Sequence, residues 1–305
     1  MSTVDQSSKA TQSVTRSRIL NDHLVYIFLL PGLLFLLGVV LFPTAYALYV
    51  STTVWNLVGE QGEFIRMANY YQMVHDYRFL LALGRTILFT VAAISIELLF
   101  GLLLALGLSR ITRHKNTFLS IFLVPFVIAP AAVAYAFLFL MNPQFGGINH
   151  MLSLIGVGPI PFLGTSSYAL PSLILVDVWQ YTPFMFLIIY AGLEALPREP
   201  FEAAKMDGAS AWQRFKWVTL PLLKPVIAIA VLIRGMDAFR AFDKFYIMTG
   251  GGPGTSSEVL SLYAYRIGFT NFDFGYATAI SLFMLFVIIV ASWLFVNFTG
   301  IIGDE

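Results

Sequence analysis

Hydrophobic residues form six long runs along the chain, and each run is long enough to cross a bilayer as a helix. The runs cover Leu24–Val50, Leu80–Leu108, Phe118–Leu140, Tyr168–Leu193, Val218–Phe239 and Tyr276–Phe298. A membrane-spanning helix needs about 20 apolar residues. The pattern therefore predicts an all-α membrane protein with six transmembrane helices. Pro125 and Pro130 interrupt the third run and Pro183 lies in the fourth, where neighbouring helices can satisfy the backbone groups that a proline frees.

The polar segments outside these runs are short and predict no second domain. Residues 1–22 are rich in Ser and Thr, so we expect a disordered cytoplasmic tail followed by one transmembrane domain over residues 23–299. The tail is not a typical signal peptide, because the apolar run after it is too long and no small-residue cleavage site follows. The sequence contains no short internal repeat.

Composition supports the membrane assignment and excludes several kinds of function. Of the 305 residues, 58% are hydrophobic and only 11% are charged, against about 25% charged in a soluble domain. The net charge of +1 gives no electrostatic reason to expect a nucleic-acid partner. The chain lacks cysteine, and its four scattered histidines form no cluster. We therefore expect no metal site and no disulfide framework.

Lysine and arginine distribution predicts the orientation of the spans, because cytoplasmic segments carry an excess of these residues. Eleven of them fall in the N-terminal tail, in the connection after the second run, and between the fourth run and the start of the fifth. Five fall on the other side, or seven if Arg85 and Arg234 near span ends are included. Both termini and the connection at residues 196–220 are therefore predicted to be cytoplasmic.

Residues 196–220 interrupt the apolar pattern with mixed, charged sequence. Pro200 suits the first turn of a helix, and Gly208 suits a helix end with positive φ. Ser210 and Gln213 have the spacing of a capping box that begins a second helix. We expect two short helices joined at Gly208 along the cytoplasmic face. They would either lie on lipid as an amphipathic connector or form a docking surface for a soluble protein.

The order of residues in this connection favours docking. Glu202-Ala203-Ala204, three residues, Gly208, nine residues and Val218-Thr219-Leu220-Pro221 resembles the EAA loop of ABC importer permeases. Val218 in place of isoleucine is the one departure from that pattern. The resemblance implies the type I ABC importer permease fold, with residues 196–220 (the coupling segment) docked on an ATP-binding subunit. It assigns the contact to Glu202, Ala203, Ala204, Asp207 and Gly208.

Other parts of the chain resemble the carbohydrate branch of this family. These are "ELLFGLLLALGLSR" from Glu97, "VPFVIAP" from Val124, "DVWQYTPFMFLIIYAGLEALP" from Asp177, "DAFRAFDKFYIMTGGGP" from Asp237 and "FGYATAIS" from Phe274. The "TGGGP" loop is typical of maltose-permease-F-like subunits. The resemblance implies half of a heterodimeric channel in the bacterial inner membrane, with a G-like second permease, a homodimeric ATP-binding subunit and an extracytoplasmic solute-binding protein. No G-x-x-x-x-G-K-[ST] phosphate loop occurs, so ATP and Mg²⁺ belong to the partner ATPase and we expect no catalytic residue or cofactor on this chain.

Polar residues within the spans are the candidates for binding the transported molecule, because such residues are costly in a membrane. Hydrogen-bonding groups and aromatic rings together suit a sugar, a polyol or a sugar derivative. The candidates are Asp177, Trp179, Gln180, Tyr181, Phe184, Asp237, Arg240 and Asp243. Phe184 is included because it lies three residues after Tyr181, on the same helix face. The maltose permease has mainly neutral amides and small groups where this chain has Asp177, Tyr181 and Asp243, so its substrate is expected to differ from maltose.

Each candidate also has a structural explanation. Asp237 and Arg240 are three residues apart and can pair with each other, Trp179 can serve in packing, and Glu97 is expected to bond a neighbouring span. Arg240 can also meet an anionic group on a substrate. An ion-gradient-driven secondary carrier is the alternative function, although the inverted repeat or broken helices around an ion site that it requires are not evident. An intramembrane enzyme would need a nucleophile and base that the sequence does not show.

Overall fold

The computed structural model describes residues 28–56, 61–111 and 115–300, and nearly all of its elements are helices. Within these residues, five helical segments are long and apolar enough to cross a membrane: Phe28–Ser51, Tyr77–Leu108, Ser166–Glu194, Ala211–Phe239 and Phe274–Thr299. A bent pair of helices supplies the sixth. Five of the predicted spans therefore correspond to single helical segments and the third to the bent pair, although the boundaries differ and residues 24–27 of the first lie outside the described residues. The tail predicted over residues 1–22 lies outside the described residues.

The third predicted span is two helices. α5 (Lys115–Val127) and α6 (Pro130–Leu140) meet at a bend of 89°. α5 continues through Pro125, and the break falls at residues 128–129, directly before Pro130. A proline at the first helical position has no backbone N–H that needs a partner, so it favours a new helix start. The predicted interruption at Pro130 is confirmed, whereas the one at Pro125 is wrong, because α5 continues through that residue.

Two further features differ from the prediction. A two-stranded antiparallel hairpin, β1 (Thr53–Trp55) with β2 (Gln61–Phe64), follows the first span and is an unpredicted addition to the all-α fold. The helix that starts after Gly208 is also not separate from the fifth span. α10 (Ala211–Arg214), a π-helical turn (Phe215–Thr219) and α11 (Leu220–Phe239) form one continuous helical segment that passes through Pro221.

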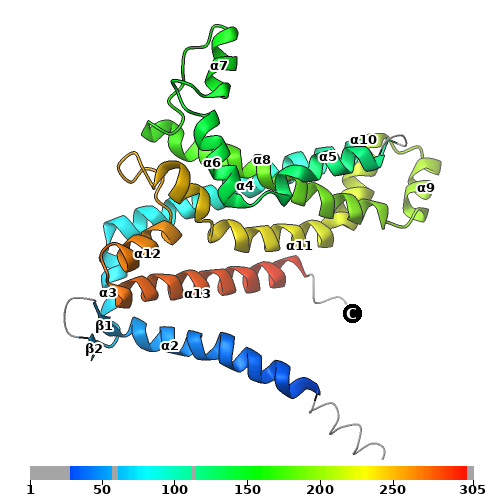
Figure 1. Cartoon of the computed structure of the whole chain (residues 1–305). Coiled ribbons are helices and arrows are strands. Elements are labelled where there is room, and N and C mark those ends of the chain that lie inside the picture. The colour runs from blue at the N-terminus through cyan, green and yellow to red at the C-terminus, as the bar shows by residue number, and fades with distance from the viewer. Residues whose placement is uncertain (1–27, 57–60, 112–114, 301–305) are drawn as a thin grey trace, which may run out of the picture.

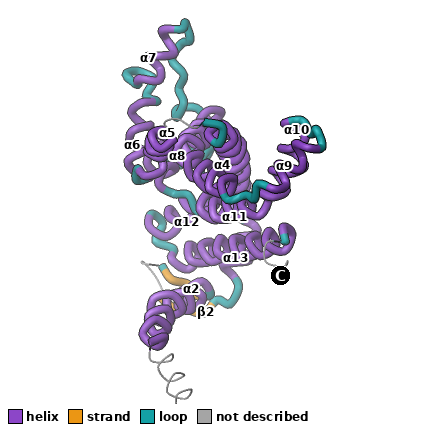
Figure 2. The backbone as a smooth tube through the Cα atoms, turned by 90° about the vertical axis from the view of Figure 1, so that its right-hand side faces the viewer, coloured by secondary structure: helices purple, strands orange, loops and turns teal. Residues whose placement is uncertain are grey.

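The central helices run side by side and define two ends of the molecule. α4 (Tyr77–Leu108), α8 (Ser166–Glu194) and α11 pack together, and α13 (Phe274–Thr299) lies between them and α2 (Phe42–Ser51) (Figures 1 and 2). One end, here the α9 end, holds α9 (Glu199–Met206), α10 and the last turn of α13. The opposite end, the α12 end, holds the hairpin, α3 (Ala68–His75) and α12 (Leu260–Phe269), and α7 (Gly147–Leu154) projects sideways beyond α6.

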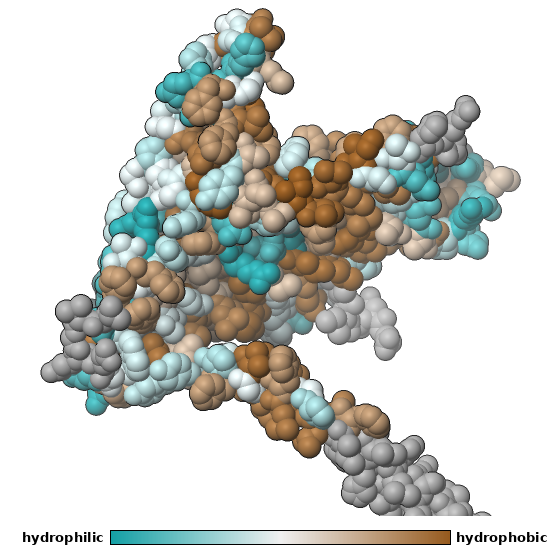
Figure 3. Space-filling model, viewed as in Figure 1, coloured by the Kyte–Doolittle hydropathy of each residue, from teal (hydrophilic) through white to brown (hydrophobic). Residues whose placement is uncertain are grey.

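Side-chain hydropathy follows this arrangement. The helices between the two ends expose mostly apolar side chains, and hydrophilic residues gather at the α9 end (Figure 3). A hydrophilic patch also interrupts the apolar surface near the left-hand end of α11 (Figure 3). Apolar side chains between the two ends suit contact with lipid. The hydrophilic patch near α11 does not suit lipid contact and therefore needs another explanation.

Close helix packing at the centre depends on a glycine. A Cβ at Gly101 of α4 would lie 2.8 Å from Met185 Cβ and 2.9 Å from the Phe186 backbone nitrogen of α8. Helices in membranes associate through small residues that let backbones approach closely. α4 and α8 are therefore held at a separation that only glycine permits at this position.

At the α12 end, Asp76 ties three helices together. Its Oδ1 accepts hydrogen bonds from the backbone N–H of Arg78 (2.9 Å) and Phe79 (3.2 Å) and so caps α4. Its Oδ2 accepts from the hydroxyls of Tyr263 on α12 and Tyr276 on α13, the latter at 2.7 Å. Burial acts to raise the pKa of Asp76, but the four hydrogen bonds outweigh it and hold the pKa below its ordinary value.

Candidate functional site

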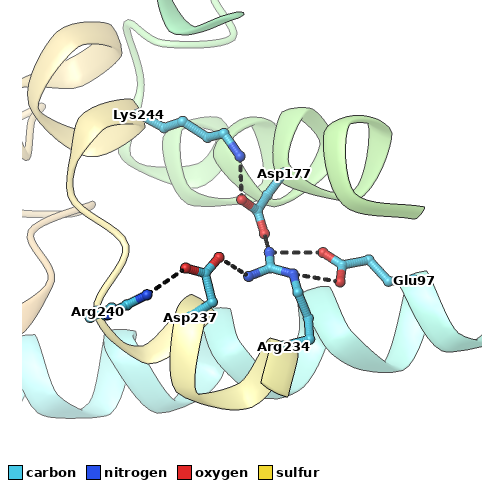
Figure 4. Close-up of polar contacts among 6 residues, drawn as sticks. All are labelled: Glu97, Asp177, Arg234, Asp237, Arg240 and Lys244. Atoms are coloured by element: carbon cyan, nitrogen blue, oxygen red, sulfur yellow. Dashed lines mark hydrogen bonds and ion pairs between the residues drawn. The ribbon is translucent and has the colours of Figure 1, made fainter. Parts of the chain in front are cut away.

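A group of charged side chains lies buried where α4, α8 and α11 meet (Figure 4). Glu97, Asp177, Arg234 and Lys244 are each less than 5% exposed. Isolated charges at such positions would cost several kcal/mol each, so they persist only as paired, hydrogen-bonded groups. Helix packing brings these residues together although they lie up to 147 positions apart in the sequence (97 to 244).

Arg234 is the centre of this network. Its guanidinium donates to both oxygens of Glu97, from Nε at 2.9 Å and from Nη2 at 3.0 Å, which is the bidentate geometry that favours arginine. Nη2 also donates to Asp177, and Nη1 donates to Asp237 at 3.1 Å. A single side chain on α11 therefore links carboxylates from α4, α8 and its own helix.

Lys244 and Arg240 complete the charge balance. Lys244, in the segment after α11, donates to the second oxygen of Asp177. Arg240 reaches Asp237 at 3.4 Å, as the sequence predicted, but its side chain is 70% exposed. The three carboxylates Glu97, Asp177 and Asp237 thus face three cations, and the network is neutral when all six groups are charged.

Tyr181 covers the network from one side. Its ring lies one helical turn from Asp177 on α8, with the Arg234 guanidinium carbon 3.9 Å from the ring centroid and the Lys244 nitrogen at 4.5 Å. Cations within about 6 Å of an aromatic face are attracted by the ring. Tyr181 therefore stabilises both buried cations and offers the rest of its ring to the adjacent space.

That space is a cavity of about 220 Å³, which we call the charged cavity. Its lining includes five of the residues proposed from the sequence: Asp177, Tyr181, Asp237, Arg240 and Asp243. Arg234, Lys244, Phe242 and Pro130 line it as well. Pro130 opens α6, so the bend in the third span forms part of the wall.

The structure places the other three candidates away from the charged cavity. Trp179 points to the opposite side of α8 and packs edge-on against Phe137, with centroids 5.1 Å apart. Gln180 donates from Nε2 to the backbone oxygen of Ile128, at the break between α5 and α6, at 2.9 Å. Phe184 packs against Phe126 of α5 at 5.5 Å. Trp179, Gln180 and Phe184 are thus positioned for packing and not for lining the cavity.

Sequence reasoning missed two residues of the site and interpreted a third correctly. Arg234 and Lys244 are not among the residues predicted from the sequence to bind substrate, yet both are buried in the network. Glu97 bonds a neighbouring span, as expected, and its partner is Arg234. Three carboxylates inside the apolar spans require buried cations, and that requirement was the available signal for Arg234 and Lys244.

The coupling segment has the predicted local structure at the α9 end. α9 carries Pro200 in its first turn, and Gly208 follows with φ of 74°, a left-handed conformation that favours glycine. Ser210 and Gln213 form the capping box, with the Gln213 N–H donating to Ser210 Oγ at 3.3 Å and the Ser210 N–H donating to Gln213 Oε1 at 2.7 Å. The two short helices therefore meet at a fixed turn.

The side chains of the coupling segment face outward. Glu202, Ala203, Asp207 and Gly208 are exposed, and Ala204 is half-buried. Met206 is 88% exposed at the end of α9, and Trp212 is 68% exposed on α10. An exposed surface that mixes carboxylates with large apolar groups has the composition of a protein contact.

Comparison with known proteins identifies the family. Residues 97–299 match the family model described as "Binding-protein-dependent transport system inner membrane component". A probable ABC transporter permease protein, y4oQ of Sinorhizobium fredii, is 39% identical over 92% of this chain and 91% of its own length. The trehalose/maltose transport system permease protein MalF of Thermococcus litoralis is 35% identical over 87% of this chain and 90% of its own.

A solved structure shows the same fold. The crystal structure of a bacterial ABC transporter involved in the import of the acidic polysaccharide alginate contains a chain that superposes with a TM-score of 0.81 at 23% identity, over 95% of this chain and 99% of that one. The family match leaves no support for the alternative of an ion-gradient-driven carrier. Because a model that covers 97–299 spans most of the chain, the chain belongs to the family of binding-protein-dependent transport system inner membrane components and is a permease subunit of an ABC importer, not an enzyme.

Proposed function

We propose that this permease carries a sugar, a polyol or a sugar derivative across the bacterial inner membrane as one half of a heterodimeric channel. The observation that carries the proposal is the charged cavity, which combines hydrogen-bonding groups and the Tyr181 ring within the spans. One relative is named for trehalose and maltose transport, and a structural neighbour is named for alginate import. Both names support a carbohydrate substrate. A G-like second permease, a homodimeric ATP-binding subunit and an extracytoplasmic binding protein complete the proposed complex.

The proposed substrate contacts are the cavity groups that the network leaves available. Arg240 is 70% exposed and makes one long contact to Asp237, so most of its five N–H donors are free for a ligand. Asp243 is exposed and lines the same cavity. Hydroxyl groups of a sugar can accept from Arg240 and donate to Asp243, while a C–H face of the ring lies against Tyr181. The neutral balance of the buried network suits an uncharged ligand.

The coupling segment is proposed to receive the movement of the ATPase. It connects the end of α8 at Glu194 to the continuous helix that becomes α11. Those two helices carry Asp177 and Arg234, and Asp177 lies 17 residues before Glu194, or about 26 Å along the helix. A displacement of the segment therefore acts on both helices that bear the cavity. In this arrangement the α9 end and both termini are cytoplasmic, and ATP and Mg²⁺ are bound by the ATPase alone.

The proposal is tested with the complete complex in proteoliposomes, supplied with its binding protein and ATP. Tyr181→Ala and Arg240→Ala are expected to reduce sugar uptake about tenfold, since each removes a contact worth about 1.4 kcal/mol, while the affinity of the binding protein is unchanged. Trp179→Ala is the matched control on the opposite side of α8. Unaltered uptake in both cavity variants would contradict the assignment of the site.

Replacement of two comparable glycines tests the coupling role. Gly208 and Gly156 both have positive φ and open space around the Cβ position, but only Gly208 lies in the coupling segment. We expect Gly208→Val to reduce ATP-driven uptake strongly and Gly156→Val to leave it near the wild-type rate, with both proteins present in the membrane. Equal transport by the two variants would remove the coupling role.

A further inference from the structure

A second hollow lies between the end of α11, α12 and the first half of α13, and its wall is aromatic. This hollow, which we call the aromatic groove, has a volume of about 750 Å³. Five rings run along and beside it: Phe242, Tyr246, Tyr265, Phe269 and Phe274. Phe242, Tyr265, Phe269 and Phe274 line the groove directly.

The rings form a continuous series. Tyr265 lies 5.2 Å from Phe242 and 5.2 Å from Phe269 between ring centroids, and Phe269 lies 6.1 Å from Phe274. These separations fall within the range of favourable aromatic contacts. Neighbouring rings therefore hold one another in place and present a fixed aromatic surface to the groove. Phe269 is 63% exposed, so its ring is available for a further contact.

Polar groups face the same groove. The hydroxyls of Ser261, Thr278 and Ser281 line it. Ser261 Oγ donates to the Ala241 backbone oxygen at 2.6 Å, and Ser281 Oγ donates to that of Ala277 at 2.9 Å, which leaves both oxygens able to accept. A predominantly apolar pocket with a few polar groups is the usual composition of a small-molecule site. An aromatic belt at a lipid interface would need the rings but not these hydroxyls.

The groove adjoins the charged cavity. Arg240 and Phe242 line both spaces, so the exposed guanidinium of Arg240 stands at their boundary. A ligand that spans the boundary would meet aromatic rings on one side and the charged network on the other. Planar rings beside hydroxyl and guanidinium groups match the chemistry of a pyranose, which has C–H faces and hydroxyl edges.

We propose that the aromatic groove is a second carbohydrate subsite, in which a sugar ring stacks on Tyr265 and Phe269 next to the charged cavity. The inference rests on the proposed function, because it needs a sugar to be carried. Its consequence is that the transported molecule occupies two adjoining spaces of about 220 and 750 Å³ rather than the charged cavity alone.

The test uses the complete complex in proteoliposomes with saturating binding protein, ATP, and radiolabelled trehalose, maltose and maltotriose as probes. Tyr265→Ala and Phe269→Ala are expected to lower uptake about fivefold, the equivalent of one aromatic contact. Tyr265→Phe keeps the ring and is expected to restore most of the rate. Phe286→Ala, an exposed aromatic on α13 outside the groove, is the control and is expected to behave as wild type. ATP hydrolysis stimulated by the binding protein should stay within about twofold of wild type, since the variants weaken sugar contact after delivery.

The outcomes separate the two proposals. If the wild-type complex imports none of the probes, import of these glucose-based sugars is overturned, and with it a subsite that stacks their rings. If the wild type imports and both alanine variants match Phe286→Ala, the subsite alone is overturned. If the alanine variants fail to co-purify with the second permease, the groove is a contact between subunits and the subsite is again overturned.

Discussion

Replacement of Arg234 by methionine should destabilise the protein far more than the same replacement at Arg240. Methionine keeps much of the length of the side chain and removes its charge and its donors. Arg234 is 2% exposed and makes ion pairs with Glu97, Asp177 and Asp237. The two arginines lie six residues apart in one segment, so the comparison isolates the effect of burial.

The expected magnitude follows from the groups that each variant leaves behind. In Arg234→Met, Asp177 keeps Lys244, but Glu97 loses the cation that pairs with both of its oxygens. An uncompensated buried charge of this kind costs about 3–5 kcal/mol. Arg240→Met removes a 3.4 Å contact from a side chain that is 70% exposed, and such a contact contributes at most about 1 kcal/mol.

A double variant checks the cause. Glu97→Gln in the Arg234→Met background removes the stranded charge, so the pair should be more stable than Arg234→Met alone. The free energy of unfolding is measured by denaturant titration of the detergent-purified complex, and the three variants are compared with wild type. The reasoning is refuted if Arg234→Met costs no more than Arg240→Met, or if adding Glu97→Gln lowers stability further.

Three further changes test other parts of the fold. Gly101→Val places a side chain 2.8 Å from Met185 Cβ and should lower the free energy of unfolding by about 1–3 kcal/mol, whereas Gly107→Val, with open space, should not; a thermal melt compares them. Ser210→Ala removes the capping box and should cost about 1 kcal/mol, seen as faster amide exchange in α10. The pKa of Asp76 is lowered in the folded protein, so the stability that its ionised carboxylate contributes is fully present above its ordinary pKa of about 3.9 and is lost as the pH falls through the lower folded-state pKa. The free energy of unfolding of Asp76→Asn should therefore depend less on pH below about 4 than that of the wild type.

The spans were predictable because lipid imposes a simple rule on sequence. Each helix that crosses the bilayer needs an unbroken apolar run, and runs of that length are rare by chance. The pairing of β1 with β2 was not predictable in the same way, since strands of three and four residues leave almost no periodic signal. Pro130 marked a break in the third span, but the 89° angle depends on how α6 packs beyond the break.

The charged cavity was predictable in part, and helix geometry explains the part that failed. Asp177 and Tyr181 are four residues apart and share one face of α8, as the structure confirms. Trp179 lies two residues from Asp177, about 200° around the helix, so the same geometry already excluded it from that face. The pairing of Arg234 with Glu97 and Asp177 was missed because these partners are 137 and 57 residues away, and no local pattern connects them.

The three helices that carry the network form one block, and this restricts where the permease can open. α4 and α8 meet closely at Gly101, and a Cβ at Gly192 of α8 would lie 2.8 Å from Val226 of α11. The Arg234 pairs join the same helices at a third level. Movement of these three helices relative to one another would break close packing and strand buried charges, each at a cost of several kcal/mol.

The break between α5 and α6 lies outside this block of three helices. There Gln180 of α8 donates to the Ile128 backbone oxygen, and Pro130 lines the charged cavity. A displacement transmitted from the coupling segment is therefore expected to move α4, α8 and α11 together and to change the cavity at its α6 wall.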